Sequence, residues 1–137
     1  MKVLFDTNVV VDVLLARAPH AAASAAVLGL AETGRLTAVM AASSVTTVHY
    51  LVRKAAGARA ARRHLETLLS ICEVAPVDGP VLRQALTLGF TDYEDAVLHE
   101  AARSARCRGI VTRDAAGFRK AALPTWTPEE LLAALHT

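Results

Sequence analysis

Short apolar runs that alternate with longer stretches of helical periodicity are the feature that most constrains how this chain folds. The runs lie at 2–5, 37–40, 71–74 and 109–112. The helical stretches lie at 8–15, 21–31, 43–54, 59–69, 80–89, 91–104 and 128–135. This alternation is typical of α/β architecture with a parallel sheet, which is the fold class that we expect.

Two helix starts carry local capping signals. Thr91 and Glu94 have the spacing of a capping box, in which a threonine hydroxyl and a glutamate carboxylate satisfy each other's backbone N–H groups. Thr127 and Glu130 repeat this spacing, with Pro128 at the first helical position. We expect a helix to begin at each box.

Length and composition set outer limits. The 137 residues suit one domain that spans 1–137. Cys72 and Cys107 have no metal-ligand spacing and are expected to be reduced and buried. No segment is apolar over a membrane-spanning length, and no secretory leader opens the chain. We therefore expect a soluble, cytoplasmic protein.

The formal net charge is only +2, but basic residues are clustered. The clusters are Arg53, Lys54, Arg59, Arg62, Arg63 and His64, and then Arg103, Arg106, Arg108 and Arg113. A basic surface around an acidic site would suit a phosphate backbone. Solvated helix faces would explain the same residues equally well.

Four aspartates occupy positions that suit a metal site. Asp6 and Asp114 each follow an apolar run, whereas Asp92 and Asp95 lie near the start of a helix. In open α/β sheets, ligands bind outside the carboxyl ends of the strands. Carboxylates that meet there repel one another, and a hard cation such as Mg²⁺, which prefers oxygen ligands, relieves the repulsion.

Each aspartate also has a purely structural explanation. Asp6 and Asp114 could cap a helix or a turn. Asp92 and Asp95, three residues apart on one helical face, could stabilise the helix start through its dipole. This explanation suits Asp92 well, but Asp95 lies a turn further in and is flanked by apolar residues.

Small polar residues accompany the acids. Thr7 and Asn8 directly follow Asp6 and could hold the turn after the strand. Thr112 lies two residues before Asp114 and could fix a carboxylate or a bound water molecule. We expect these three residues to support the site.

Two further residues are weaker candidates for substrate binding. His99 lies four residues after Asp95 and could contact a phosphate or pair with that acid, although such a histidine is more often half-exposed on a helix. Arg113 could position a phosphate backbone at the rim. The chain contains no nucleophile elbow and no glycine-rich phosphate loop, which argues against a serine hydrolase and against P-loop or Rossmann nucleotide binding.

The segments 5–10, 92–96 and 111–114, in this order and spacing, resemble the PIN domain. The resemblance covers essentially the whole chain. It implies a Rossmann-like three-layer α/β/α sandwich and a ribonuclease site that depends on Mg²⁺ or Mn²⁺. Many small bacterial members are toxins of toxin–antitoxin pairs of the VapBC type. The resemblance thus implies an RNA substrate, a homodimer and an antitoxin partner.

By position, the resemblance assigns Asp6, Asp95 and Asp114 to the first, third and fourth acidic motifs. Asp92 matches an additional acid that is often present one turn earlier. Thr7, Asn8 and Thr112 match the polar residues that support the family's site.

One motif departs from the family. A glutamate is usual in the helix after the second strand, but the stretch 43–54 contains no acid, and Thr46, Thr47 or His49 occupies its neighbourhood. Either Asp92 substitutes for the missing ligand, or metal binding is weakened.

Three functions remain open from the sequence. The first is metal-dependent hydrolysis of RNA through Asp6, Asp92, Asp95 and Asp114. The second is an RNA- or protein-binding module of the same fold with weak or lost catalysis. The third is a small-molecule phosphohydrolase. The aspartyl-phosphate type would need an aspartate at position 8, where Asn8 stands, so this interpretation is disfavoured.

Overall fold

A five-stranded sheet in which every pairing is parallel forms the centre of the protein. The computed structural model describes residues 1–136, so that the predicted domain end at Thr137 lies outside the described residues. The strand order is β3-β2-β1-β4-β5. The strands are β1 (Lys2–Phe5), β2 (Thr37–Ala41), β3 (Glu73–Ala75), β4 (Gly109–Val111) and β5 (Thr125–Trp126).

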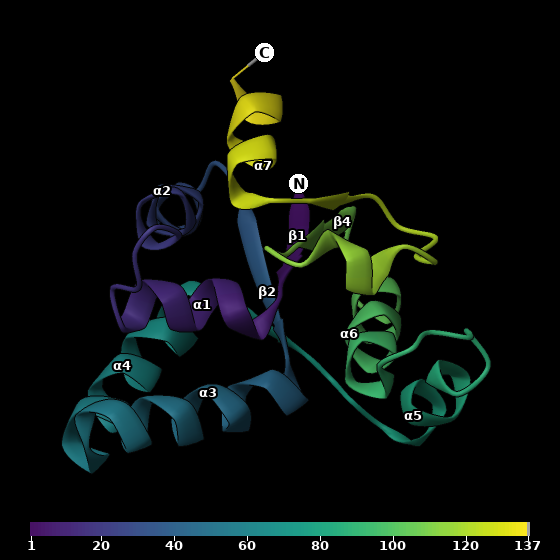
Figure 1. The fold of residues 1–137 in the computed structure, drawn as a ribbon, viewed down its shortest axis with the longest axis horizontal. Coiled ribbons are helices and arrows are strands. Elements are labelled where there is room, and N and C mark those ends of the chain that lie inside the picture. The colour runs from purple at the N-terminus through teal and green to yellow at the C-terminus, as the bar shows by residue number, and fades with distance from the viewer. Residues whose placement is uncertain (137) are drawn as a thin grey trace.

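Helices cover both faces of this sheet (Figure 1). They are α1 (Thr7–Leu14), α2 (Ala21–Glu32), α3 (Ala42–Ala56), α4 (Ala58–Ile71), α5 (Gly79–Ala85), α6 (Tyr93–Ser104) and α7 (Pro128–Leu135), with a 3₁₀ helix η1 (Ala115–Phe118). In Figure 1, α1 to α4 lie to the left of the sheet and α5 and α6 to the right. The predicted α/β class and three-layer arrangement are confirmed.

Alternation along the central strand builds two cores. Val3 and Phe5 point into the core with α1, α2, α3, α4 and α7. Leu4 points to the opposite face, into the core with α5 and α6. All three side chains are fully buried. Since a parallel strand covered on both faces must be apolar throughout, this burial explains why β1 is an unbroken apolar run.

The winding of the chain changes direction between β1 and β4. The connections from β1 to β2 and from β2 to β3 pass over one face through α1 to α4. The connection from β3 to β4 returns over the other face through α5 and α6. Neighbouring strands whose connections leave toward opposite faces open a crevice at their carboxyl ends, which is where such sheets bind ligands.

One of the two predicted capping boxes forms. Thr127 and Glu130 exchange hydrogen bonds at the start of α7, as expected. The box at Thr91 is wrong. Asp92 is the N-cap of α6, and its Oδ1 accepts the Glu94 N–H at 2.9 Å. The Asp92 carboxylate thus accepts the Glu94 N–H that we had expected the Thr91 hydroxyl to accept. The helix therefore begins at Tyr93, two residues later than expected.

Two short elements, β5 and η1, were not predicted from the sequence. Helix α5 ends at Ala85, earlier than the predicted range 80–89. Strand β5 has only two residues and no apolar run. It is set by backbone bonds, in which the Ile110 N–H donates to the Pro124 carbonyl and the Thr112 N–H to the Trp126 carbonyl. The 3₁₀ helix η1 directly follows Asp114. No helix within 1–136 is long and apolar enough to cross a membrane.

The approach of β5 to β4 depends on a glycine. A Cβ added to Gly109 would lie 2.6 Å from the Pro124 carbonyl oxygen and would overlap the Trp126 ring. We expect Gly109→Ala to lower the free energy of unfolding in urea by about 1–3 kcal/mol, because the core would be overpacked. The matched change Gly29→Ala meets no atom within 4 Å and should be neutral or stabilise by up to ~1 kcal/mol. Equal stability of the two variants would contradict this account.

Candidate functional site

A cavity of about 360 Å³ opens at the carboxyl ends of β1 and β4, where the winding changes direction. Five of the side chains that line it are acidic: Asp6, Asp92, Glu94, Asp95 and Asp114. The other lining residues are Thr7, Asn8, Val11, Arg17, Leu51 and Arg113. The fold thus brings together the four aspartates singled out in the sequence. It adds a fifth acid, Glu94, whose sequence position indicated only a capping role.

Asp6 is the most deeply buried of these acids. Its backbone N–H donates to the Val111 carbonyl at 2.9 Å, which extends the pairing of β1 with β4. Its Oδ2 accepts the Thr112 hydroxyl at 2.8 Å and the Asn8 amide at 3.3 Å. Burial raises the pKa of the Asp6 carboxyl above its usual 3.8, and the bond from Thr112 opposes that shift.

Thr112 joins acids from two strands. Its hydroxyl donates to Asp6 and accepts the Asp114 N–H at 3.0 Å. The Thr7 hydroxyl instead donates to the buried Ser44 hydroxyl at 2.9 Å, which ties the start of α1 to α3. Asn8 and Thr112 thus bond directly to the Asp6 carboxylate, whereas the Thr7 side chain joins two helices beside it.

Asp95 is half-buried on α6, and its carboxylate approaches that of Asp114. A Cβ on Gly117 would lie 2.6 Å from Oδ2 of Asp95 and 3.4 Å from Oδ2 of Asp114. The bare backbone of Gly117 in η1 thus leaves room for both carboxylates. No sequence pattern singled out Gly117. Its only signal is a glycine three residues after a candidate acid.

The negative charge of the cavity most strongly affects the carboxyl group of Asp95. Burial, followed by the negative charges of Asp6, Asp92, Asp114 and Glu94, raises the pKa of its carboxyl to about 7. A carboxyl that titrates near neutral pH amid like charges is typical of a functional site. It is also the situation that a bound cation would relieve.

The sequence assigned one additional acid of the site to Asp92, but both Asp92 and Glu94 line the cavity. Asp92 is exposed, and one of its oxygens is bound to the Glu94 N–H. Among the described residues, no hydrogen bond or ion pair engages the Glu94 carboxylate. Its charge raises the pKa of both Asp6 and Asp95, and its side chain also lines the adjoining cavity that faces α3.

Helix α3 supplies no charge to the site. Its Leu51 lines the acidic cavity, and its Thr46 and Thr47 hydroxyls donate to the Ser43 carbonyl at 3.2 Å each. His49, which the sequence left as a candidate replacement for the glutamate, is half-buried and lines neither the acidic cavity nor the cavity that adjoins it. Glu94 therefore faces a helix without a competing acid.

Two arginines line the acidic cavity, Arg17 and Arg113. Arg113 is held by Asp12, with 2.7 Å between its Nε and Oδ2 of that acid. Asp12 is fully buried in α1, and its Oδ1 has no hydrogen-bond partner among residues 1–136. Since a buried carboxylate is costly without a partner, this pair fixes Arg113 at the rim. The sequence signal for Asp12 was a single acid within an apolar helix.

His99 does not reach the cavity, so its assignment to substrate is corrected. It is buried, its Nε2 accepts the Ala122 N–H at 3.0 Å, and its Nδ1 lies 2.9 Å from Oε2 of Glu100. Because Nε2 is an acceptor, Nδ1 carries the proton and donates to Glu100. Helix α6 is buried all round from Ala96 to Ala102, which places His99 inside the protein, one turn beyond the cavity.

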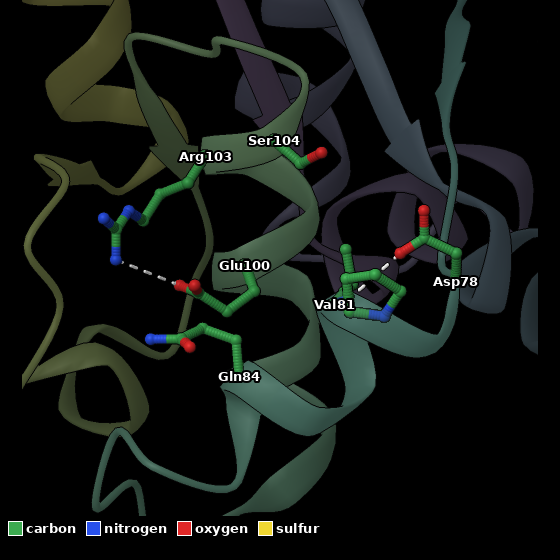
Figure 2. Close-up of a pocket in the computed structure, with 7 residues that line it drawn as sticks. Asp78, Val81, Gln84, Glu100, Arg103 and Ser104 are labelled. Carbon is green, nitrogen blue, oxygen red and sulfur yellow. Dashed lines mark hydrogen bonds and ion pairs between the residues drawn. The ribbon is translucent and has the colours of Figure 1, made fainter.

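A larger cavity of about 450 Å³ lies between α5 and α6 and shares no lining residue with the acidic cavity. Figure 2 shows its side chains, among them the Glu100–Arg103 pair, with 3.5 Å between the charged atoms. Asp78 is the N-cap of α5 and accepts the Val81 N–H. These polar groups are already paired, whereas the acids of the smaller cavity repel one another. The chemistry therefore favours the smaller cavity as the site.

The acidic cavity has the donor chemistry of a site for a hard divalent cation. Five acidic side chains face two basic ones, and carboxylate oxygens are preferred ligands of Mg²⁺. Beside Asp6, Oδ1 of Asn8 is buried, and no described residue forms a hydrogen bond with it. Within residues 1–136, no three His, Cys, Asp or Glu side chains are grouped so that they could hold an ion directly. A cation here would keep several water ligands, as Mg²⁺ commonly does.

The model of the PIN domain family matches residues 2–116. This chain belongs to the PIN domain family. No curated protein matches this chain in sequence.

Solved structures share the fold. VapBC2 from Rickettsia felis, bound to a promoter DNA fragment, has a TM-score of 0.70 at 18% identity over 92% of this chain and 99% of that one. A toxin–antitoxin complex from Klebsiella pneumoniae has a TM-score of 0.70 at 20% identity, over 92% and 97%. VapC20 of Mycobacterium tuberculosis, a sarcin–ricin loop cleaving toxin, has a TM-score of 0.62 at 14% identity, over 79% and 86%.

The raised pKa of Asp95 predicts how stability depends on pH without metal. Between pH 4 and 7 the folded protein holds this proton and the unfolded chain releases it, so the contribution of Asp95 is fully present below about pH 4 and is lost as pH rises through about 7. In EDTA, Asp95→Asn should therefore gain stability relative to wild type from pH 4 to pH 8, by roughly 2–4 °C in melting temperature.

Thermal denaturation at several pH values measures this difference. The matched change Glu32→Gln, on an exposed residue of α2 outside the cavity, should give the same difference at each pH. A difference between Asp95→Asn and wild type that does not change with pH would contradict the assignment of the charge repulsion to Asp95.

Proposed function

We propose that this PIN domain is a ribonuclease that hydrolyses RNA phosphodiester bonds with Mg²⁺ or Mn²⁺. The observation that carries the proposal is the convergence of five acidic side chains on one cavity at the carboxyl ends of β1 and β4. Membership of the PIN family supports nuclease activity at the family level. Cleavage of the sarcin–ricin loop is a property of VapC20 itself, and it supports the proposal only through the shared fold.

The cation would be held by Asp6, Asp95 and Asp114, in part through its water ligands, with Glu94 and Asp92 at the margin. When bound, it would neutralise charge on the phosphodiester and lower the pKa of an attacking water molecule. Thr112 and Asn8 hold the Asp6 carboxylate in place through their hydrogen bonds. Gly117 leaves the space in which Asp95 and Asp114 approach each other. No side chain needs to act as the nucleophile.

The two arginines of the cavity would position the RNA backbone. Arg113 is oriented by its pair with the buried Asp12, and Arg17 lines the same wall. Contacts of this kind set register on a phosphate backbone and carry no sequence information by themselves. The other predicted basic residues do not line this cavity, and Arg62 and Arg103 are engaged by Glu66 and Glu100.

We further propose that the protein is a toxin of a toxin–antitoxin pair and that an antitoxin binds it. We also propose that it forms a homodimer and is located in the cytoplasm. The complexes from Rickettsia felis and Klebsiella pneumoniae support a protein partner, because one chain of each shares this fold over nearly its whole length. Dimerisation would use an apolar helical surface of α3 and α4. Sedimentation that shows a monomer at all micromolar concentrations would contradict a homodimer.

Cleavage of an RNA panel tests the central claim. Structured and single-stranded RNAs are incubated with wild type and with Asp95→Asn, in Mg²⁺, in Mn²⁺ and in EDTA. We expect cleavage that requires metal and falls at least a hundredfold in Asp95→Asn, since transition-state charge stabilisation of this kind is worth about 10²–10³ in rate. Circular dichroism confirms that the variant is folded.

Two outcomes would change the proposal. Cleavage that persists in EDTA or in Asp95→Asn would exclude this cavity as the site. A folded wild type that cleaves no RNA and binds no Mn²⁺ would favour the second candidate, a binding module, for which the absence of an acid on α3 is the supporting observation.

The missing glutamate of α3 leads to a separate prediction. Glu94 lines the same cavity as Ser43 and Thr47 of α3, and its carboxylate is unpaired within the described part of the chain. Asp92 instead uses one oxygen for the helix cap. We expect Glu94→Gln to weaken Mn²⁺ binding roughly tenfold or more, as measured by calorimetry. Asp92→Asn should weaken it less, because asparagine still caps the helix.

The control is Glu129→Gln, which also changes an exposed glutamate in the first turn of a helix, but on α7 and outside the cavity. It should leave the affinity unchanged. A larger loss in Asp92→Asn than in Glu94→Gln would assign the compensating role to Asp92, as the sequence alone had suggested.

A further inference from the structure

We propose that the cavity between α3, α5 and α6 binds one nucleobase of the RNA, next to the phosphate that lies over the acids. The cavity has a volume of about 300 Å³. Its lining residues are Ser43, Thr47, Leu82, Tyr93, Glu94 and Val97. The inference rests on the proposed ribonuclease function and adds a recognition site to it.

Glu94 shows that this cavity lies beside the acidic one. This side chain lines both the acidic cavity and the one beside it, so the two spaces adjoin along a single wall. In RNA, a base is joined to its neighbouring phosphates through one sugar. A strand whose phosphate lies at the acids must therefore place an adjacent base in nearby space, and this cavity is the adjoining one.

Tyr93 gives the cavity an aromatic wall that is already in place. Its side chain is 44% exposed, and its hydroxyl donates to the Leu82 carbonyl at 2.8 Å. Because Tyr93 is on α6 and Leu82 on α5, this bond fixes the ring between two helices and leaves part of it in solvent. Single-stranded RNA is commonly recognised by stacking unpaired bases on such rings.

The remaining walls combine apolar and polar groups as a base requires. Leu82 and Val97 supply apolar surface beside the ring. The Thr47 hydroxyl donates to the Ser43 carbonyl, which leaves its oxygen free to accept a bond from a base edge. This mixture distinguishes the cavity from the acidic one, whose charge would repel RNA in the absence of a cation.

A double-mutant cycle between the ring and the base tests the proposal without relying on cleavage. The probe is a fluorescein-labelled single-stranded RNA in Mn²⁺, together with versions in which each nucleotide in turn is abasic. The protein is Asp6→Asn, with and without Tyr93→Ala, and affinity is measured by fluorescence anisotropy. We expect Tyr93→Ala to weaken binding of the intact RNA roughly tenfold.

The diagnostic result is the coupling between the two changes. One abasic position should weaken binding to the Asp6→Asn parent by a similar factor and should cause no further loss when Tyr93 is already alanine. Thr47→Leu, which fills the cavity while the ring stays in place, should produce the same loss. This second variant keeps the test valid if Tyr93→Ala folds poorly.

Two controls separate stacking from structural effects. Tyr93→Phe keeps the ring and removes only the bond to the Leu82 carbonyl, so it should retain most of the affinity. Tyr50→Ala removes another exposed aromatic residue, on α3, that lines neither cavity, and should leave binding unchanged.

Failure of this proposal and failure of the ribonuclease proposal give different results. Wild-type cleavage that is unaltered in rate and site by Tyr93→Ala would overturn the base site alone. Tyr93-dependent, base-dependent binding by a protein that never cleaves would support the base site and overturn the nuclease. Equal losses at every abasic position, or an abasic loss that is unchanged by Tyr93→Ala, would overturn the base site.

Discussion

The parallel pairing of β1 with β4 is the constraint on which the rest of the site depends. It places strands that are about a hundred residues apart in the sequence side by side, at the point where the winding of the sheet changes direction. The bond from the Asp6 N–H to the Val111 carbonyl continues this pairing, and Thr112 then binds the Asp6 carboxylate and the Asp114 backbone together. Because both strands are buried on both faces, neither can shift by one residue without moving its side chains to the wrong core. The acids are held together by a sheet whose register is strongly specified.

Repulsion among the acids is the cost of that convergence. The Asp95 carboxyl shows it most clearly, since burial and four neighbouring negative charges raise its pKa to about 7. A protein can tolerate such an arrangement when a ligand of opposite charge binds there, and the donor set of this cavity suits a hard cation. Helix α3 contributes no acid, and Glu94 enters the cavity from α6 instead. The site therefore draws its negative charge from β1, α6 and the turn after β4, and its α3 wall is open to apolar and hydroxyl contacts.

The strands and most helices could be predicted from the sequence because their apolar patterns are local. Four of the five strands lie at or within two residues of their predicted positions, as does the start of α7 at Thr127. Strand β5 was missed because two residues carry no pattern and only the pairing with β4 defines them. The helix start at Thr91 was wrong because Asp92 competes for the same amide and wins at a shorter spacing. His99 was misplaced because helical spacing gives the face of a residue but not which neighbours cover that face.

For the site, the sequence by itself determined which acids end strands or begin a helix, since each follows or precedes a run of fixed periodicity. It therefore pointed to Asp6, Asp92, Asp95 and Asp114, and to the PIN family. Only the tertiary structure decided the rest. It shows that Glu94 rather than a residue of α3 faces Asp6 and Asp95, that Asp12 holds Arg113, and that Gly117 leaves space for two carboxylates. These relations join residues on different elements, and the distance between elements is set by packing, which no local pattern in the chain encodes.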